Sequence, residues 1–225
     1  MKFKNIICFL IILLPKIVFG QQFFRIEGDF TIKEKTDNKA QLIIGRFYYD
    51  KNIDKLVYNI KFPEPQIYVF KDTQLLQFVA DTLYKVTSIA NINKLTIFSL
   101  ALNNNINNFG LEKTIYKLEN VEKENDMIIS TWIPRKKFNN LFGKILLSTK
   151  NNKLTGVIFF NKEDKIIMKQ FFEDYQNFKG LDFPTKIIKI LYVNEKPYYH
   201  ITTFEKIKVN NTSSNFYYDY PIPIK

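Results

Sequence analysis

The sequence predicts a mainly β fold of the α+β class, in which a short helical insert interrupts one antiparallel sheet. In the second half of the chain, apolar runs alternate with short polar turns such as Lys150–Lys153 and Lys162–Lys165. Strands joined by such short loops pair antiparallel, because a parallel return needs a crossover of roughly a dozen residues or more. In the first half, residues 24–33 alternate between apolar and polar side chains, as a half-buried strand does. The middle of the chain differs, because its apolar residues recur at helical spacing.

The first half of the chain predicts an antiparallel meander. In Phe24–Lys33 the even positions are apolar or Gly, so the even face is expected to point inward. The polar stretch Glu34–Lys39 turns the chain, Phe62–Pro65 ends the third strand, and Asp72–Gln74 closes a hairpin. The predicted strands are Phe24–Lys33, Ala40–Asp50, Lys55–Lys61, Gln66–Lys71 and Leu75–Val79.

The middle of the chain predicts a helical insert over residues 91–121. Two segments carry apolar residues on one helical face, and the polar tract Asn103–Asn108 separates them. We expect this insert to cover the concave face of the sheet rather than to form its scaffold. The first apolar stripe comprises Ile92, Leu95, Phe98 and Leu102, and the second, in Leu111–Val121, comprises Leu111, Ile115, Leu118 and Val121.

The second half returns to strands, two of which are apolar on both faces. Neither Leu154–Phe160 nor Ile187–Val193 has a solvent side, whereas an antiparallel sheet normally keeps one wet face. Two dry faces need two covers: helices or another sheet can provide one, and a ligand can provide the other. The predicted strands are Met127–Pro134, Lys144–Thr149, Leu154–Asn161, Ile166–Tyr175, Lys186–Val193 and Tyr198–Val209.

Residues 1–20 have the pattern of a secretory signal peptide. Lys2 and Lys4 precede an apolar run that is shorter than the roughly 20 residues of a membrane span, and Gly20 provides a small residue before Gln21. We therefore expect export to the periplasm with cleavage near Gly20, and one domain over residues 21–225. The single Cys, Cys8, lies within the signal, so the mature chain has no thiol for a disulfide.

The composition provides no catalytic constellation. One His, His200, is too few for a multi-His metal site, and adjacent Glu173 and Asp174 point to opposite faces of a strand. The mature chain has 30 basic and 22 acidic residues, a net charge of +8, but its lysines are scattered through turns and strand edges. We expect no enzyme activity, no metal and no cofactor.

The chain is rich in aromatic side chains, with 22 Phe and 13 Tyr. Most of these are expected to pack in the core. Exposed aromatics on a basic protein can also stack on single-stranded nucleic acid, but export argues against that partner. A dry concave face suits an acyl chain or another apolar ligand better.

Several stretches, taken in order, resemble the LolA-like family of periplasmic carriers of outer-membrane lipoproteins. They begin with the signal peptide and cover most of the mature chain. The segments that carry the resemblance are Gly45, Tyr58, Pro63 with Pro65, the hairpin Gln66–Phe78, the helical segment Leu95–Leu102, the passage Phe172–Pro184 and the ending Phe216–Pro221.

The chain departs from the pattern of this family at three places. The hairpin turn reads Asp72-Thr73-Gln74 where the family has Asp-Gly-Lys. Lys51-Asn52 stands where the family often has Arg-Pro, and that Arg is tied to closing the lid over the cargo. The helix expected before the first strand is absent or very short, since Phe23 closely follows the cleavage site.

The resemblance implies an incomplete antiparallel β-barrel, covered by short helices, whose apolar concavity takes the acyl chains of lipoproteins or lipids. Implied partners are transport proteins of the inner and outer membranes, and we expect a monomer. The alternative is a non-catalytic envelope accessory protein that uses the same sheet to bind a peptide edge or a protein. The candidate lining residues are Tyr58, Tyr68, Phe70, Phe78, Leu95, Phe98, Trp132 and Ile158; which face of the sheet lines the cavity is left open.

We predict that the exported protein begins near Gln21. The apolar run is short and ends in a small residue, which is the arrangement that signal peptidases cleave. N-terminal sequencing of the protein from a periplasmic fraction tests this, and a chain that keeps Met1 in a membrane fraction would contradict it.

Overall fold

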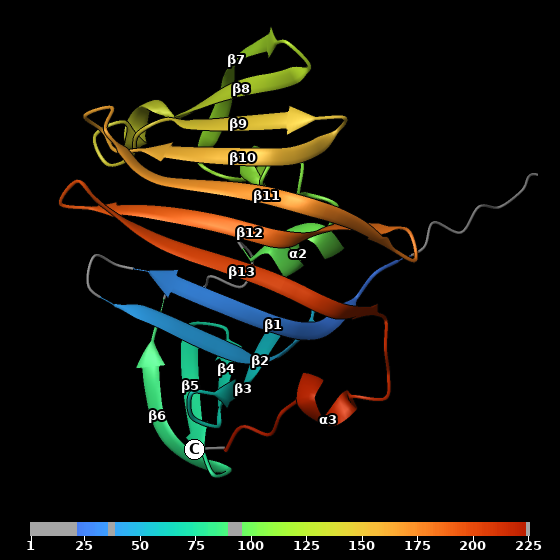
Figure 1. Cartoon of the computed structure of the whole chain (residues 1–225). Coiled ribbons are helices and arrows are strands. Elements are labelled where there is room, and N and C mark those ends of the chain that lie inside the picture. The colour runs from blue at the N-terminus through green and yellow to red at the C-terminus, as the bar shows by residue number, and fades with distance from the viewer. Residues whose placement is uncertain (1–21, 36–38, 90–95, 224–225) are drawn as a thin grey trace, which may run out of the picture.

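The computed structural model describes residues 22–35, 39–89 and 96–223. Within them, thirteen strands form one antiparallel sheet in the order β6-β5-β4-β3-β2-β1-β13-β12-β11-β10-β9-β8-β7 (Figure 1). The sheet consists of two meanders, β1–β6 and β7–β13, in which each strand pairs with the next one in sequence, and the pairing of β1 with β13 joins them. The strands are β1 (Arg25–Lys35), β2 (Ala40–Asp50), β3 (Lys55–Phe62), β4 (Gln66–Lys71), β5 (Gln74–Val79), β6 (Thr82–Ser88), β7 (Tyr116–Glu124), β8 (Met127–Pro134), β9 (Ile145–Lys150), β10 (Lys153–Phe160), β11 (Ile166–Phe178), β12 (Leu181–Val193) and β13 (Lys196–Val209).

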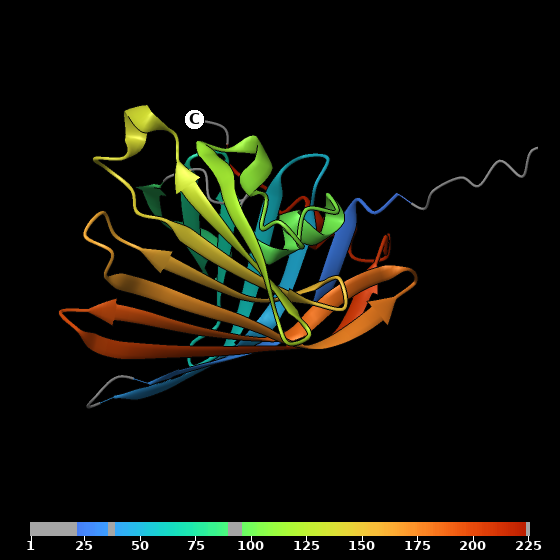
Figure 2. The same cartoon turned by 90° about the horizontal axis from the view of Figure 1, so that it is seen from above.

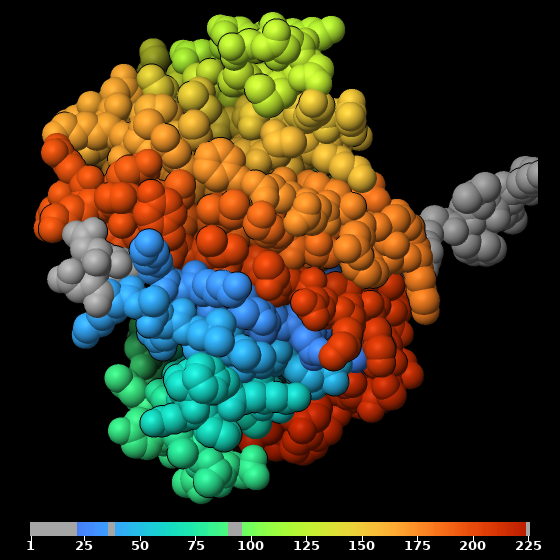
Figure 3. All heavy atoms as spheres, viewed as in Figure 1, coloured from blue at the N-terminus to red at the C-terminus, as the bar shows by residue number. Residues whose placement is uncertain are grey.

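The sheet curls strongly but does not close, because β6 and β7 remain as its two edges. Figure 2 shows the two ends of the sheet rising around α2, which lies in the concavity. The opposite, convex face is the one seen in Figure 3. This confirms the predicted mainly β fold, an incomplete antiparallel barrel with short helices. The helical elements are α2 (Ile97–Leu102), α3 (Asn215–Tyr218) and the 3₁₀ turns η3 (Leu111–Lys113) and η4 (Lys136–Phe138).

The core on the concave side centres on Phe98 of α2. Its ring stacks on Phe47 at 4.3 Å between ring centroids and on Phe183 at 6.1 Å, and it meets Phe204 edge-on at 5.6 Å. The helix begins at Thr96, whose hydroxyl oxygen accepts a hydrogen bond from the Ser99 amide, and it ends at Asn103. The predicted helical cover is therefore present at Phe98 and Leu102, while Ile92 and Leu95 lie outside the described residues.

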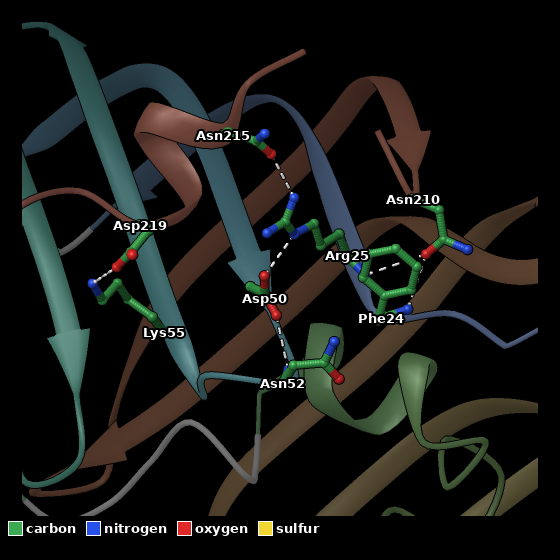
Figure 4. Close-up of polar contacts among 8 residues, drawn as sticks. All are labelled: Phe24, Arg25, Asp50, Asn52, Lys55, Asn210, Asn215 and Asp219. Atoms are coloured by element: carbon green, nitrogen blue, oxygen red, sulfur yellow. Dashed lines mark hydrogen bonds and ion pairs between the residues drawn. The ribbon is translucent and has the colours of Figure 1, made fainter. Parts of the chain in front are cut away.

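A second core lies on the convex side of β2–β5, under the C-terminal segment. Tyr218 of α3 and Tyr220 pack on it and are almost fully buried. The segment is held by polar contacts to the sheet (Figure 4). Arg25 Nε lies 2.6 Å from Asp50 Oδ2, its Nη1 donates to Asn215 at 2.6 Å, and Lys55 pairs with Asp219. The sheet residues of this second core are Tyr48, Val57, Val69, Leu76 and Phe78.

The expected helix over Leu111–Val121 is wrong. Only Leu111–Lys113 is helical, as one 3₁₀ turn, and Tyr116–Glu124 forms β7, paired with β8 from Tyr116 opposite Pro134 onward. Leu118 and Val121 are exposed rather than packed on one helical face. Their helical spacing does not produce a helix, because pairing with β8 determines the conformation of this segment. The helical insert therefore ends before β7.

In the passage Phe172–Pro184, which carries part of the resemblance, β11 and β12 form a hairpin. Lys179 and Gly180, with φ of 54° and 92°, turn the chain between β11 and β12. Pro184 lies within β12, opposite Tyr175. The inward even face of the first strand is confirmed at Ile26 and Phe30, which are buried in the concave core.

We predict that Phe98→Ala lowers the free energy of unfolding by about 3–5 kcal/mol, because the aromatic layer around this ring would be left with a cavity. Urea denaturation followed by far-UV circular dichroism measures the loss. Leu141→Ala is the control: this side chain is 69% exposed, so the change is expected to stay within about 0.5 kcal/mol. Equal effects of the two substitutions would contradict the central role of Phe98.

Candidate functional site

One wall of the concave face is an aromatic surface on β3 and β4. Tyr58 and Tyr68 are directly opposite each other in the register, and Phe70 is two residues further on the same face. Tyr58 meets Phe70 edge-on at 5.9 Å and Phe30 at 5.1 Å between ring centroids. All three predicted residues, Tyr58, Tyr68 and Phe70, are only partly buried against the concave core.

This wall carries no charge of its own. Burial raises the pKa of Tyr58 far above its ordinary value, so its hydroxyl stays neutral. Tyr68 donates its hydroxyl proton to Gln66 Oε1 at 3.1 Å, and Gln77 donates to the same oxygen at 2.7 Å. The wall can therefore present apolar ring surface and a small amide network, which suits an acyl chain.

The opposite wall is built from β8–β11. Trp132 is buried on the concave side opposite Ile145, and its Nε1 donates to Ser130 Oγ at 3.0 Å. Phe159 and Phe172 continue this wall toward Phe109, whose ring centroid is 5.9 Å and 6.1 Å from theirs. The structure thus brings Trp132 onto the same curved face as Tyr58, Tyr68, Phe70 and Phe98.

Two of the predicted residues lie on the other face. Phe78 packs on Tyr220 at 5.1 Å in the convex core, because it is opposite Ile67 rather than Tyr68 in the register. Ile158 stands between Val157 and Phe159, which both belong to the concave core, so it points to the convex side. The expectation that these two line the concavity is corrected accordingly, and Leu95 lies outside the described residues.

Lys51 connects the end of β2 to the end of α2. Its Nζ donates a hydrogen bond to the carbonyl oxygen of Leu102, the last residue of the helix, at 3.0 Å. A cation at this position also suits the partial negative charge of a helix C-terminus. In the LolA-like pattern that the sequence resembles, this position often carries the Arg that is tied to closing the lid. The sequence therefore already singled out Lys51, as a departure from that pattern.

Two clefts open beside α2, and Lys51 with Asn103 lines both of them. The first has a volume of about 590 Å³ and reaches Tyr175 and Leu181 on β11 and β12. The second has about 550 Å³ and reaches Tyr49. Both clefts therefore border the C-terminal part of α2, from Ser99 to Asn103.

The described residues contain no cluster of metal-ligating side chains. Across residues 22–35, 39–89 and 96–223, no three His, Cys, Asp or Glu side chains gather closely enough to hold a metal ion. Glu173 pairs with Lys186 at 2.8 Å, and His200 Nδ1 lies 3.1 Å from Glu34 Oε1. Over the same ranges, no helix has the length and apolar composition to cross a membrane.

Comparison with known proteins supports the fold. No family model matches the chain, and no curated protein matches it by sequence. Solved structures do match. A LolA superfamily protein from Nitrosomonas europaea superposes with a TM-score of 0.57 at 14% identity, over 88% of this chain and 91% of that one. A DUF1329 family protein from Desulfovibrio piger gives 0.60 at 13%, over 88% and 90%. A putative outer membrane lipoprotein-sorting protein domain from Vibrio parahaemolyticus gives 0.58 at 12%, over 88% and 91%.

These similarities define the class of fold. The chain shares the fold of these three proteins, matched over nearly the whole length of each. At such low identity the match shows the fold alone, and it agrees with the family that the sequence resembles.

We predict that an acyl chain bound in the concavity quenches the fluorescence of Trp132, which is the only Trp of the chain. Its ring belongs to the concave core, so a brominated palmitate bound there should reduce the emission, whereas unlabelled palmitate should not. Titration of the folded protein measures this, with Trp132→Phe as the blank. Binding without any quenching would place the ligand away from this wall.

Proposed function

We propose that this protein is a periplasmic carrier that shields the acyl chains of lipoproteins or lipids on its concave face for transfer to the outer membrane. The observation that carries the proposal is the aromatic wall of Tyr58, Tyr68 and Phe70, whose side chains are only partly buried against the concave core. A second apolar wall, which includes Trp132, belongs to the same concave core. The carrier works by burial alone and needs no chemical step. The fold shared with lipoprotein-sorting proteins supports this reading.

The energetics of such shielding are favourable. Each methylene removed from water contributes about 0.8 kcal/mol, so covering half of a roughly 16-carbon chain gives about 6 kcal/mol before the entropic cost of binding. A partly covered groove is therefore sufficient. A polar or charged side chain on either wall would weaken it, because burying an unpaired charge is costly.

The proposed carrier opens by moving α2. Phe98 fills the centre of the concavity, so a bound chain has to displace it or pass beside it. The hydrogen bond from Lys51 to Leu102 then acts as the latch of the closed state. We further propose that transport proteins of the inner and outer membranes load and unload the protein by releasing this latch.

The alternative, an accessory protein that pairs with a peptide, is favoured by one observation. The edge strand β7 is exposed at eight of its nine residues. However, Lys117, Glu119 and Lys123 alternate along it, and charged edges discourage strand addition. The carrier is therefore the better supported function.

We predict that Tyr68→Glu reduces the affinity for a fluorescent fatty-acyl probe at least tenfold, because it places a carboxylate on the apolar wall. Tyr199→Glu is the matched control, since Tyr199 is exposed and its neighbour His200 occupies the concave side. Fluorescence titration measures binding, and circular dichroism checks that both variants keep the β signal.

Two outcomes would overturn the proposal. The wild-type protein fails to bind the probe, or both variants lose affinity equally. In either case the accessory function replaces the carrier, and a cross-linking search along β7 is the next step.

A further inference from the structure

A row of polar side chains crosses the concave face at a distance from α2. In the register, Gln170 of β11 is opposite Lys189 of β12, Lys189 is opposite His200 of β13, and His200 is opposite Glu34 of β1. Lys189 lies six residues along β12 from Phe183, the residue on which Phe98 stacks. Six residues of strand span about 20 Å, so the row is well separated from the centre of the concavity, where Phe98 packs.

The strand pattern fixes which way this row faces. Ile187 belongs to the concave core, and the pairing of β12 with β11 and β13 has no bulge between Ile187 and Lys189. On β13, Phe204 belongs to the same core, and the pairing from Thr203 to Lys196 is likewise regular. Since side chains alternate between faces, Lys189 and His200 point into the concavity. The contact of 3.1 Å between His200 Nδ1 and Glu34 Oε1 agrees with this placement.

Lys189 is the cation of this row that lacks a counter-charge. Glu34, the carboxylate of the row, is engaged by His200. Among the described residues, no carboxylate forms an ion pair with Lys189, although the neighbouring Lys186 on the convex side pairs with Glu173. Lys189 is half-buried, and this burial lowers the pKa of its ammonium group. A partly desolvated ammonium without a partner is unfavourable, and a bound anion relieves that cost.

The row is bordered by apolar side chains on the same face. Ile187 and Ile32 lie on the side toward α2, and Met168 and Leu191 lie on the other side, again by alternation from Gln170 and Lys189. One cation set in an apolar surface recognises an amphiphile: the charge contacts Lys189, while the chain follows the strands toward Phe183 and the aromatic wall.

We propose that Lys189, with Gln170 and His200 beside it, binds the anionic phosphate or carboxylate head of an amphiphile whose acyl chain lies on the concave face. The inference deepens the carrier function proposed above and rests on it, because it assigns the class of cargo as anionic lipid. The side-chain amide of Gln170 adds hydrogen-bond donors beside the ammonium group.

The test compares two ligands that share one acyl glycerol and differ in a phosphate group. Wild-type protein is titrated with 1-palmitoyl glycerol and with its phosphate, and binding is followed by displacement of a fluorescent acyl probe. We expect the phosphate form to bind about tenfold more tightly, which is what one charge-assisted hydrogen bond provides. Lys189→Gln should abolish this preference and leave the affinity for 1-palmitoyl glycerol unchanged.

Controls separate the possible failures. Lys208→Gln removes the same charge from an exposed position on the convex side, opposite Glu27, and should keep the preference. Millimolar inorganic phosphate should not displace the lipid, and if it does, Lys189 is a site for free phosphate rather than for a headgroup. Equal binding of the two ligands, or a preference that survives Lys189→Gln in a folded protein, overturns the headgroup site while the carrier function stands. If neither ligand binds the wild type, the carrier function itself fails.

Discussion

The structure depends on the contact of one helix with an aromatic layer that is assembled from distant parts of the chain. Phe98 touches Phe47 of β2, Phe183 of β12 and Phe204 of β13, so a single ring links the two meanders that β1 and β13 join in the sheet. Gly45 serves the same layer, because a Cβ there would lie 2.9 Å from the Phe30 ring and 2.4 Å from the Asn59 carbonyl oxygen. A side chain at this position would push apart the rings of Phe30 and Tyr58, which meet edge-on. The concave face of the sheet and the ring of Phe98 that fills its centre are therefore packed together as one core.

On the convex side, β2–β5 present a second apolar surface, which needs a cover of its own. The C-terminal segment covers that face with Tyr218 and Tyr220, and polar contacts hold the cover in place. Beneath it Glu27 is almost fully buried, with Arg46 Nη2 at 3.5 Å and Asn211 donating to its Oε1 at 3.0 Å. The concave face of these strands is consequently free to serve another purpose, since their other face is already dry without a ligand.

Much of the fold could be predicted from local patterns, and the errors arise where long-range pairing decides. Short turns and alternating runs located most strands, and Met127–Pro134 matches β8 at both ends. The helical spacing of Leu111, Leu118 and Val121 misled, because a strand paired with β8 tolerates the same residues. The face on which each candidate residue lies was predicted in part. Tyr68 and Phe70 share a face as expected, but only the register with β5 shows that Phe78 faces away from them. The row around Lys189 joins residues from four strands, and no local pattern reveals that they are neighbours.

The short length of α2 makes a packed concavity compatible with the proposed carrier function. A helix of six residues is not stable alone, so tertiary contacts hold it, chiefly Phe98 and the hydrogen bond from Lys51. Burying one Phe side chain contributes about 1.5–3 kcal/mol, whereas each methylene of an acyl chain contributes about 0.8 kcal/mol. Roughly two to four methylenes therefore match the apolar contact that Phe98 gives up, and a longer chain exceeds it. In the proposed carrier, the cargo replaces the ring of Phe98 while the concave face stays covered, which is the condition that a carrier without an energy source has to meet.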